Sequence, residues 1–184
     1  KFIYLISPNK ISPKFYLDLK KVLKTNKICF FQMRLKKYSF EKKVFIGKKI
    51  KKICRINKVN FIVNDDPILA KKLDADGCHL GQKDININDA RKIIGNKIIG
   101  VTCHNSIKLA KYAIKNNANY IAFGAFFGTK TKKTLHKSNI KTLNKAKALA
   151  NIPIVAIGGI NFNNYKKLLL NNANFLAISS YIWN

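Results

Sequence analysis

The chain has 184 residues, 47% of them hydrophobic, which is enough for one domain with a sizeable core and predicts a single domain over residues 1–184. It carries 36 Lys and Arg against 8 Asp and Glu, yet only three of the basic residues are Arg. Because the lysines are spread along the whole chain and Arg reads phosphates and base edges better, we expect no nucleic-acid partner. No apolar run approaches the roughly 18 residues of a membrane helix, so we expect no membrane partner.

Short apolar runs rich in Ile, Val and Phe alternate with amphipathic, Lys-rich segments. Helical spacing is clearest at Phe15–Leu23, Val44–Ile56, Ile107–Ile114 and Leu143–Leu149. The apolar runs are predicted strands: Phe2–Ile6, Ile28–Met33, Phe61–Val63, Cys78–Leu80, Ile98–Val101, Tyr120–Phe123, Ile154–Ile157 and Phe175–Ile178. Continuous apolar strands that alternate with helices are typical of a parallel sheet covered on both faces. Eight of them favour the α/β class and a closed (β/α)8 TIM barrel, with the final helix expected to be absent.

Polar side chains follow nearly every predicted strand at its C-terminal end, where barrels of this kind collect their active sites. In chain order they are Gln32, Arg34 and Lys36; Asn64 and Asp65; Gln82 and Asp84; Thr102 and His104; residues 129–132; Gly158 and Gly159; and Ser179. Because the carboxyl ends of parallel strands lie on one side of a barrel, the sequence predicts that these residues surround one mouth.

The first of these groups alternates along the chain, so Gln32, Arg34 and Lys36 are predicted to face the same side. Together they would offer an amide, a planar guanidinium and an ammonium to one anionic ligand. In so basic a chain, however, a Lys at a strand end is also expected by chance, and the alternative is ordinary surface charge.

Two carboxylates, Asp65 and Asp84, follow neighbouring predicted strands in a chain that has few acids. Hard oxygen ligands without a nearby His or Cys cluster favour Mg²⁺, which takes one or two carboxylates and completes its shell with water and phosphates. The alternative for the first pair of acids is helix capping at Pro67, which we assign to Asp66, leaving Asp65 for the metal. Asp84 could instead stabilise a turn.

Two loops are candidate phosphate sites. Thr129, Thr131 and Lys132 supply hydroxyls and an ammonium after the sixth strand, although an ordinary solvated loop would have the same composition. After the seventh strand, Gly158 and Gly159 precede a helix expected to begin at Asn161, and Ser179 with Ser180 would complete the site from the eighth strand. The alternative for the glycines is a simple tight turn.

The remaining chemically active side chains are predicted to be structural. His79 lies within an apolar run and His136 in a polar loop, whereas the position of His104 at the mouth leaves its role open. The four cysteines are far apart, which is typical of reduced thiols in a cytoplasmic protein. Because no Ser-His-Asp or Cys-His arrangement is visible, we expect catalysis by positioning and charge stabilisation rather than through a covalent intermediate.

Taken in order, the motifs resemble those of the thiamine-phosphate synthase family, also described as the thiamine monophosphate synthase or TENI-like family. The resemblance covers nearly the whole chain and rests on residues 32–36, 63–65, 75–84, 99–104, 123–132, 155–160 and 178–179. The chain departs from the family pattern at Gly128, where Pro is usual, and at Thr102, where Ser is commoner. It also has Asp66-Pro67 where an Arg more often follows Asp65.

The resemblance implies a transferase that joins hydroxymethylpyrimidine diphosphate to a thiazole phosphate, giving thiamine phosphate and pyrophosphate through a dissociative, Mg²⁺-assisted step. It also implies the catalytic and binding roles. Asp65 and Asp84 would hold Mg²⁺; Arg34, Lys36 and Lys132 the diphosphate; Gln32 and Asn64 the pyrimidine; Thr102 the pyrophosphate; and Thr129, Thr131, Gly159, Ile178 and Ser179 the thiazole phosphate.

Two alternatives remain at this stage. A related branch of the family, the thiazole tautomerases, relies on a His just after the sixth strand, where this chain has Gly124-Ala125, but His104 keeps that reading open. The second alternative is a noncatalytic basic barrel that binds phosphate or nucleic acid. The sequence does not exclude a homo-oligomer.

Overall fold

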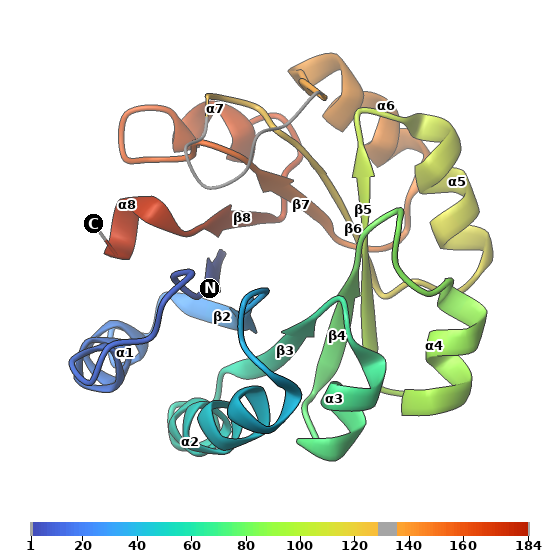
Figure 1. The fold of residues 1–184 in the computed structure, drawn as a ribbon. Coiled ribbons are helices and arrows are strands. Elements are labelled where there is room, and N and C mark those ends of the chain that lie inside the picture. The colour runs from blue at the N-terminus through green and yellow to red at the C-terminus, as the bar shows by residue number, and fades with distance from the viewer. Residues whose placement is uncertain (1, 129–135, 184) are drawn as a thin grey trace.

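The eight predicted strands form a closed parallel barrel surrounded by helices (Figure 1). The computed structural model describes residues 2–128 and 136–183. Its elements, in chain order, are β1 (Ile3–Ile6), α1 (Phe15–Leu23), β2 (Ile28–Met33), α2 (Phe40–Ile56), β3 (Asn60–Asn64), α3 (Pro67–Lys72), β4 (Gly77–Leu80), α4 (Ile87–Ile94), β5 (Ile98–His104), α5 (Ile107–Lys115), β6 (Tyr120–Gly124), α6 (Ile140–Leu149), β7 (Ile154–Ile157), α7 (Tyr165–Leu169), β8 (Phe175–Ile178) and α8 (Ser180–Trp183). Each strand pairs with the next, and β8 pairs with β1, so the predicted (β/α)8 barrel is confirmed.

Three details of the sequence prediction were wrong. Strand β5 continues beyond Val101 to His104 through an irregularity in its pairing with β6, which hydrophobicity alone did not indicate. Helix α7 begins at Tyr165 rather than at Asn161. The chain also continues from β8 into the single turn of α8, where no helix was expected.

The side chains of the barrel form two apolar layers because alternate residues of a strand point to opposite faces. One layer lies between the sheet and the helices and includes Leu5 and Ile121. The other contains Tyr4 and Tyr120, whose hydroxyls are 2.7 Å apart. Strands β1 and β6 are not neighbours in the closed sheet, so this contact must cross the barrel interior.

The ring of Tyr120 occupies space that a neighbouring residue leaves empty. A Cβ added to Gly100 on the adjacent strand β5 would lie 1.8 Å from Cζ of Tyr120. Glycine is therefore required at position 100 for steric reasons, because the Tyr120 ring is fully buried and cannot move aside.

Strands β4, β6 and β8 are each preceded by the same three-residue pattern, Asx-Ala-Asx (Asx is Asp or Asn), at residues 74–76, 117–119 and 172–174. The first Asx of each pattern has a positive φ, which Asp and Asn tolerate better than most residues. The last one uses a side-chain oxygen to accept from an N–H at the start of the preceding strand, from its first or second residue: Asp76 from Phe61 (2.7 Å), Asn119 from Ile99 (2.8 Å) and Asn174 from Ile154 (2.8 Å). The pattern therefore fixes strand register at the end of the barrel opposite the mouth.

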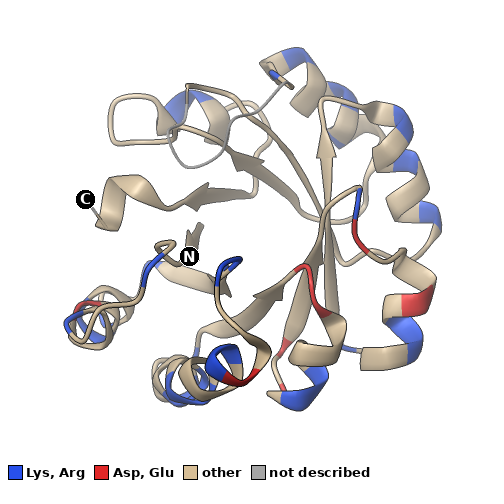
Figure 2. Ribbon diagram, viewed as in Figure 1, with Lys and Arg blue, Asp and Glu red and all other residues tan. Residues whose placement is uncertain are grey.

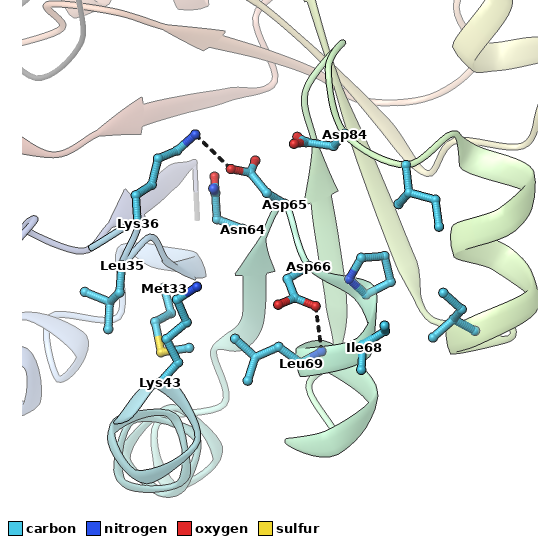
Figure 3. A pocket seen from close by; sticks show the side chains of 13 residues that line it. Met33, Leu35, Lys36, Lys43, Asn64, Asp65, Asp66, Ile68, Leu69 and Asp84 are labelled. Carbon is cyan, nitrogen blue, oxygen red and sulfur yellow. Dashed lines mark hydrogen bonds and ion pairs between the residues drawn. The ribbon is translucent and has the colours of Figure 1, made fainter. Parts of the chain in front are cut away.

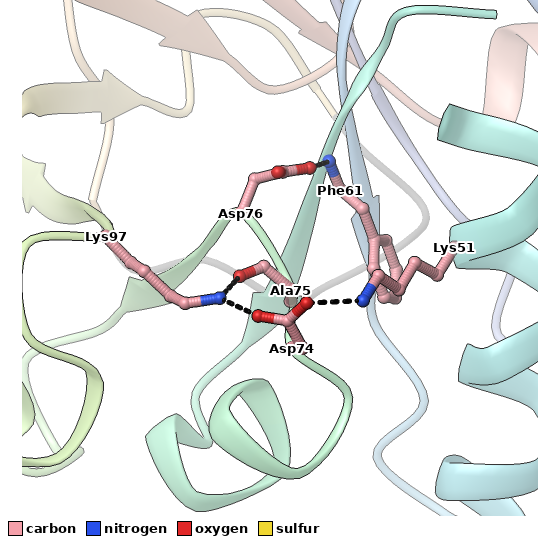
Figure 4. A network of polar contacts seen from close by, with 6 residues as sticks. All are labelled: Lys51, Phe61, Asp74, Ala75, Asp76 and Lys97. Atoms are coloured by element: carbon pink, nitrogen blue, oxygen red, sulfur yellow. Dashed lines mark hydrogen bonds and ion pairs between the residues drawn. The ribbon is translucent and has the colours of Figure 1, made fainter. Parts of the chain in front are cut away.

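Charged residues reinforce the same end. Asp74 accepts hydrogen bonds from Lys51 (2.8 Å) and Lys97 (2.5 Å), and Lys97 also donates to the carbonyl of Ala75 (Figure 4). These two lysines lower the pKa of Asp74 to about 2. Because the carboxylate is almost fully exposed, we expect the pair to contribute less than about 1 kcal/mol.

Most of the positive charge lies on the outer helices and their connecting loops, while the strands carry almost none (Figure 2). This distribution agrees with the even spread of Lys along the sequence. Among the described residues, no helix is both long and apolar enough to cross a membrane.

The role of the last Asx side chain can be tested at Asn174, which accepts from the N–H of Ile154. Replacing Asn174 by Ala would leave the N–H of Ile154 without its acceptor, and we expect a loss of about 1–2 kcal/mol in the free energy of unfolding. Asn174→Asp keeps an oxygen there, as Asp76 does in the equivalent position, and should restore most of that stability. Urea denaturation of the three proteins measures both effects. Equal stability of Asn174→Ala and the parent protein would contradict this role.

Candidate active site

A cavity of about 490 Å³ opens at the carboxyl ends of β2, β3 and β4. Lys36, Asn64, Asp65 and Asp84 line it, so the structure brings together four of the residues predicted from the sequence (Figure 3). Nζ of Lys36 lies 2.9 Å from Oδ2 of Asp65, and the carboxylates of Asp65 and Asp84 point toward one another. Two acids and one cation therefore share a small volume at the mouth.

Local backbone geometry separates the roles of the two adjacent acids. Asp66 is the N-cap of α3: its Oδ1 accepts from the N–H of Leu69 at 2.9 Å, with Pro67 in the first turn, as predicted. The preceding Asp65 has a φ of +65°, and its N–H extends the β3–β4 ladder to the carbonyl of His79. This unusual conformation turns the Asp65 side chain into the cavity, away from the helix that Asp66 caps.

Asp84 has a structural role as well as a place in the cavity. Its Oδ2 accepts from the N–H of Gly81 at 2.7 Å and closes the turn after β4, which is the alternative that the sequence had left open. Burial and the neighbouring carboxylate of Asp65 raise the pKa of Asp84, against the effect of the Gly81 hydrogen bond. Burial also acts to raise the pKa of Asp65, but the hydrogen bond and charge of Lys36 hold it below its usual value.

The donor set of this pair fits a magnesium ion. Two carboxylates facing each other repel when both are ionised, and a divalent cation between them would relieve that repulsion. Within residues 2–128 and 136–183, no group of three or more His, Cys, Asp and Glu side chains converges as it would around zinc. Two hard oxygen donors are sufficient for Mg²⁺, because water and substrate phosphates usually complete its coordination.

A chain of hydrogen bonds crosses the barrel interior. Nε2 of Gln32 donates to the Tyr4 hydroxyl (2.9 Å), which pairs with the hydroxyl of Tyr120. Tyr120 in turn lies 2.9 Å from Nδ1 of His79, whose Nε2 lies 2.8 Å from Oγ1 of Thr102. Two predicted site residues on opposite sides of the barrel, Gln32 and Thr102, are thus held in one network.

The sequence analysis missed the tyrosines of this network and read His79 only as structural. Each lies within an apolar run and so looked like core. The available signal was their spacing: Tyr4, Gln32, His79 and Tyr120 all occupy inward-facing positions of strands, where a polar atom requires a partner. Burial raises the pKa of both tyrosines, so their hydroxyls stay protonated and can act as donors.

The other predicted anion-binding residues on β2 and β8 lie at the same mouth. Arg34 follows β2 and is half-buried, and burial lowers the pKa of its guanidinium. Ser179 follows β8 and donates through Oγ to the carbonyl of Ser7 at 3.3 Å. Ile178 is the last residue of β8 and is buried.

The two glycines after β7 are shaped by the chain that packs on them. Gly158 and Gly159 have φ values of +105° and +62°, and a Cβ on Gly159 would lie 2.3 Å from the carbonyl oxygen of Gly128. The segment 125–128 lies across this strand end, with Phe126 and Phe127 donating to Ile157 and Gly158. The tight turn, which was the alternative to a phosphate site, therefore explains in part why residues 158 and 159 are glycines. The late start of α7 also means that no helix N-terminus directly follows the glycines.

Part of the predicted site lies outside the described residues, namely Thr129, Thr131 and Lys132. The chain on either side is anchored at the mouth: Ala125 donates to the carbonyl of His136, and Ser138 donates to that of Ala125. The rings of His104 and His136 pack with centroids 4.2 Å apart. His104, left open by the sequence, thus contacts the segment that follows β6.

Three of the four cysteines are poor nucleophiles. Cys54, Cys78 and Cys103 are buried, and burial raises the pKa of the Cys103 thiol to about 12. A thiol with so high a pKa is protonated at neutral pH and reacts poorly.

Comparison with known proteins gives a consistent result. A family model described as thiamine monophosphate synthase matches residues 3–182. A thiamine-phosphate synthase of Pelagibacter ubique is 64% identical over all of this chain and 89% of its own length, and one of Erythrobacter litoralis is 39% identical over 98% of this chain and 87% of its own. A solved thiamine phosphate pyrophosphorylase from Pyrococcus furiosus superimposes with a TM-score of 0.87 at 30% identity, covering 97% of this chain and 85% of that one.

The close approach at Gly159 gives a testable prediction. Gly159→Ala should displace the segment 125–128 and lower the free energy of unfolding by about 1–3 kcal/mol. Gly95→Ala is a matched control, because Gly95 has a similar φ of +61° but no heavy atom within 4 Å of an added Cβ. Chemical denaturation of both variants separates backbone strain from steric clash. An equal loss in the two would remove the steric explanation.

Proposed function

The chain belongs to the thiamine monophosphate synthase family, and on that premise we propose that it is a thiamine-phosphate synthase, a transferase that joins two phosphorylated substrates and releases pyrophosphate. The observation that carries the proposal is the cavity at the ends of β2–β4, where Lys36, Asp65 and Asp84 meet beside Asn64. This arrangement suits a ligand with a diphosphate group, and it lies at the end of the barrel where such enzymes work.

The proposed reaction needs no nucleophilic side chain. The bond between the pyrimidine methylene carbon and the diphosphate oxygen breaks, the electron pair leaves with pyrophosphate, and the thiazole nitrogen then forms a bond to the cationic carbon. The protein's task is to stabilise the charge of the leaving group and to hold the two reactants in line. Arg34, Lys36 and Lys132 are proposed to bind the departing pyrophosphate, with the Thr102 hydroxyl beside it.

The interior network supports the proposed roles of Gln32 at the pyrimidine and of Thr102 beside the pyrophosphate. Gln32 is fixed through Tyr4, and Thr102 through His79, so neither side chain must be ordered when substrate binds. Asn64 lines the cavity at the ends of β2–β4 and is proposed to contact the pyrimidine with Gln32. The Gln32 amide is buried and carries no charge, which suits a neutral heterocycle better than a charged group.

The thiazole phosphate is proposed to lie on the other side of the mouth, at the ends of β6, β7 and β8. Gly159, Ile178 and Ser179 would contact its phosphate, together with Thr129 and Thr131.

We also propose that Asp65 and Asp84 bind Mg²⁺. When bound, the ion would neutralise charge on the diphosphate and so make it a better leaving group. Lys36, ion-paired to Asp65 without the metal, is within reach of the same anionic group.

A cytoplasmic location is proposed from Cys54, Cys78 and Cys103, which are buried thiols outside any disulfide. Free buried thiols are usual in reducing compartments. Fractionation of cells that express the protein would test this.

The synthase proposal is tested by mixing the purified protein with hydroxymethylpyrimidine diphosphate and thiazole phosphate, with and without Mg²⁺. We expect pyrophosphate release that requires all three components, with thiamine phosphate formed in equal amount. No release from folded protein would exclude the synthase. Isotope exchange into a carboxylated thiazole phosphate would then indicate the tautomerase, for which His104 packed against His136 beside the end of β6 is the relevant feature.

The metal proposal predicts that Asp65→Asn and Asp84→Asn each lower kcat at a fixed Mg²⁺ concentration by roughly a hundredfold or more, because each removes a charged ligand. Asp66→Asn is the matched control. It makes the same change of charge on the adjacent residue, and Asn caps a helix as well as Asp does. Titration of activity with Mg²⁺ measures the effect. Unchanged Mg²⁺ dependence in either site variant would remove that residue from the metal site.

A further inference from the structure

Ser7, the first residue after β1, is buried and forms hydrogen bonds to both neighbouring strands. Its N–H donates to the carbonyl of Gln32 at 2.9 Å, and its Oγ accepts from the N–H of Arg34 at the same distance. Its carbonyl oxygen accepts from Oγ of Ser179 at 3.3 Å. With only 2% of its surface exposed, Ser7 lies between β2 on one side and β8 on the other.

The bond to Arg34 differs from regular parallel pairing. In a parallel ladder, a residue that donates its N–H to one residue of the neighbouring strand normally accepts, through its carbonyl, from the N–H two positions further along. Ser7 donates to Gln32, so its carbonyl would be expected to accept from Arg34. Here the side-chain oxygen takes that position. The carbonyl is therefore available to β8, where Ser179 uses it.

From this geometry we propose that Ser7 is a positioning residue that couples the two substrate sites. The inference rests on the proposed function, in which Arg34 binds the diphosphate and Ser179 the thiazole phosphate. Ser7 accepts from the backbone N–H of Arg34 through its hydroxyl oxygen, and this leaves its carbonyl oxygen to accept from the side chain of Ser179. The strand end between the sites then sets the position of both anion-binding groups.

Neighbouring contacts support a fixed β1 end. Nε1 of Trp183 in α8 donates to the carbonyl of Ile6 at 2.6 Å. On the other side, Oδ1 of Asn9 accepts from Nη1 of Arg34 at 3.3 Å, and the N–H of Ile11 donates to the Tyr38 hydroxyl at 3.0 Å. The Asn9 contact is exposed and longer, so we assign the main positioning effect to Ser7.

Loss of the hydroxyl has a defined consequence. In Ser7→Ala, the N–H of Arg34 either has no acceptor or donates to the carbonyl oxygen of residue 7. In the second case, Oγ of Ser179 loses its acceptor. Either change displaces an anion-binding group while leaving the catalytic side chains in the protein. We therefore expect KM to rise roughly three- to tenfold for at least one of the two substrates, the range of one lost hydrogen bond, with a smaller change in kcat.

The experiment compares Ser7→Ala, Ser7→Thr and Ser39→Ala in the full chain, with KM for each substrate, kcat and the melting temperature. Ser7→Thr keeps the oxygen and should restore the parent KM values. Ser39→Ala is the matched control, because it removes a serine that caps α2 in the loop after Arg34 without contacting either site residue. It should lower the melting temperature only. If Ser7→Ala likewise lowers the melting temperature but leaves both KM values unchanged, or if folded Ser7→Thr fails to restore them, the proposal is overturned.

A double-mutant cycle tests the coupling itself. Once the hydroxyl of Ser7 is absent, Ser179→Ala should have a smaller effect on the thiazole phosphate KM than it has in the parent protein. Additive effects would show that Ser7 does not connect the two sites. Failure of the proposed function is distinguishable, because the parent protein would then release no pyrophosphate, whereas failure of this inference leaves an active parent with an unaffected Ser7→Ala variant.

Discussion

The contact between Tyr4 and Tyr120 across the barrel is the interaction on which the site depends. A closed sheet of eight parallel strands must fill its interior with side chains, and here two aromatic residues from non-adjacent strands meet in it. Their hydroxyls need partners because they are buried, and the partners available are the residues of the next layer toward the mouth, Gln32 and His79. The same contacts therefore fill the core and orient the polar side chains of Gln32 and His79. The carboxylates and the basic groups at the mouth then occupy positions set by strand ends.

Several residues at the mouth serve the fold and the site at once. Asp84 closes a turn with one carboxylate oxygen and lines the cavity beside Asp65, and Ser7 completes a ladder while it holds Arg34. Such double use places charged groups accurately, since a side chain already restrained by a turn loses little entropy when substrate arrives. It also means that loss of activity in a variant does not by itself identify a catalytic residue. Measurements of stability beside KM and kcat are needed to separate the two.

The sequence predicted the barrel well because buried parallel strands appear as short continuous apolar runs, and all eight were placed from this pattern. Residues such as Lys36, Asn64, Asp65 and Asp84 could be assigned to one mouth because a strand's polar end is visible in the sequence. The interior network was missed because Tyr4, His79 and Tyr120 lie within apolar runs and resemble core residues, although their inward-facing spacing was a usable signal. Positions fixed by backbone conformation were also missed, among them the positive φ of Asp65 and the continuation of β5 to His104. These depend on tertiary contacts rather than on local propensity.

The space shared by Gly100 and Tyr120 has a consequence for variation of this enzyme. Positions 100 and 120 lie on adjacent strands and share one space in the barrel interior. The Tyr120 ring fills this space, and Gly100 contributes no side chain to it. Neither can change size alone without a clash or a void, so accessible sequences must exchange the two together. A library that varies them independently would contain mostly unfolded members, whereas paired exchange, with a smaller residue at 120 and a larger one at 100, would explore new packings of the barrel interior while preserving packing density.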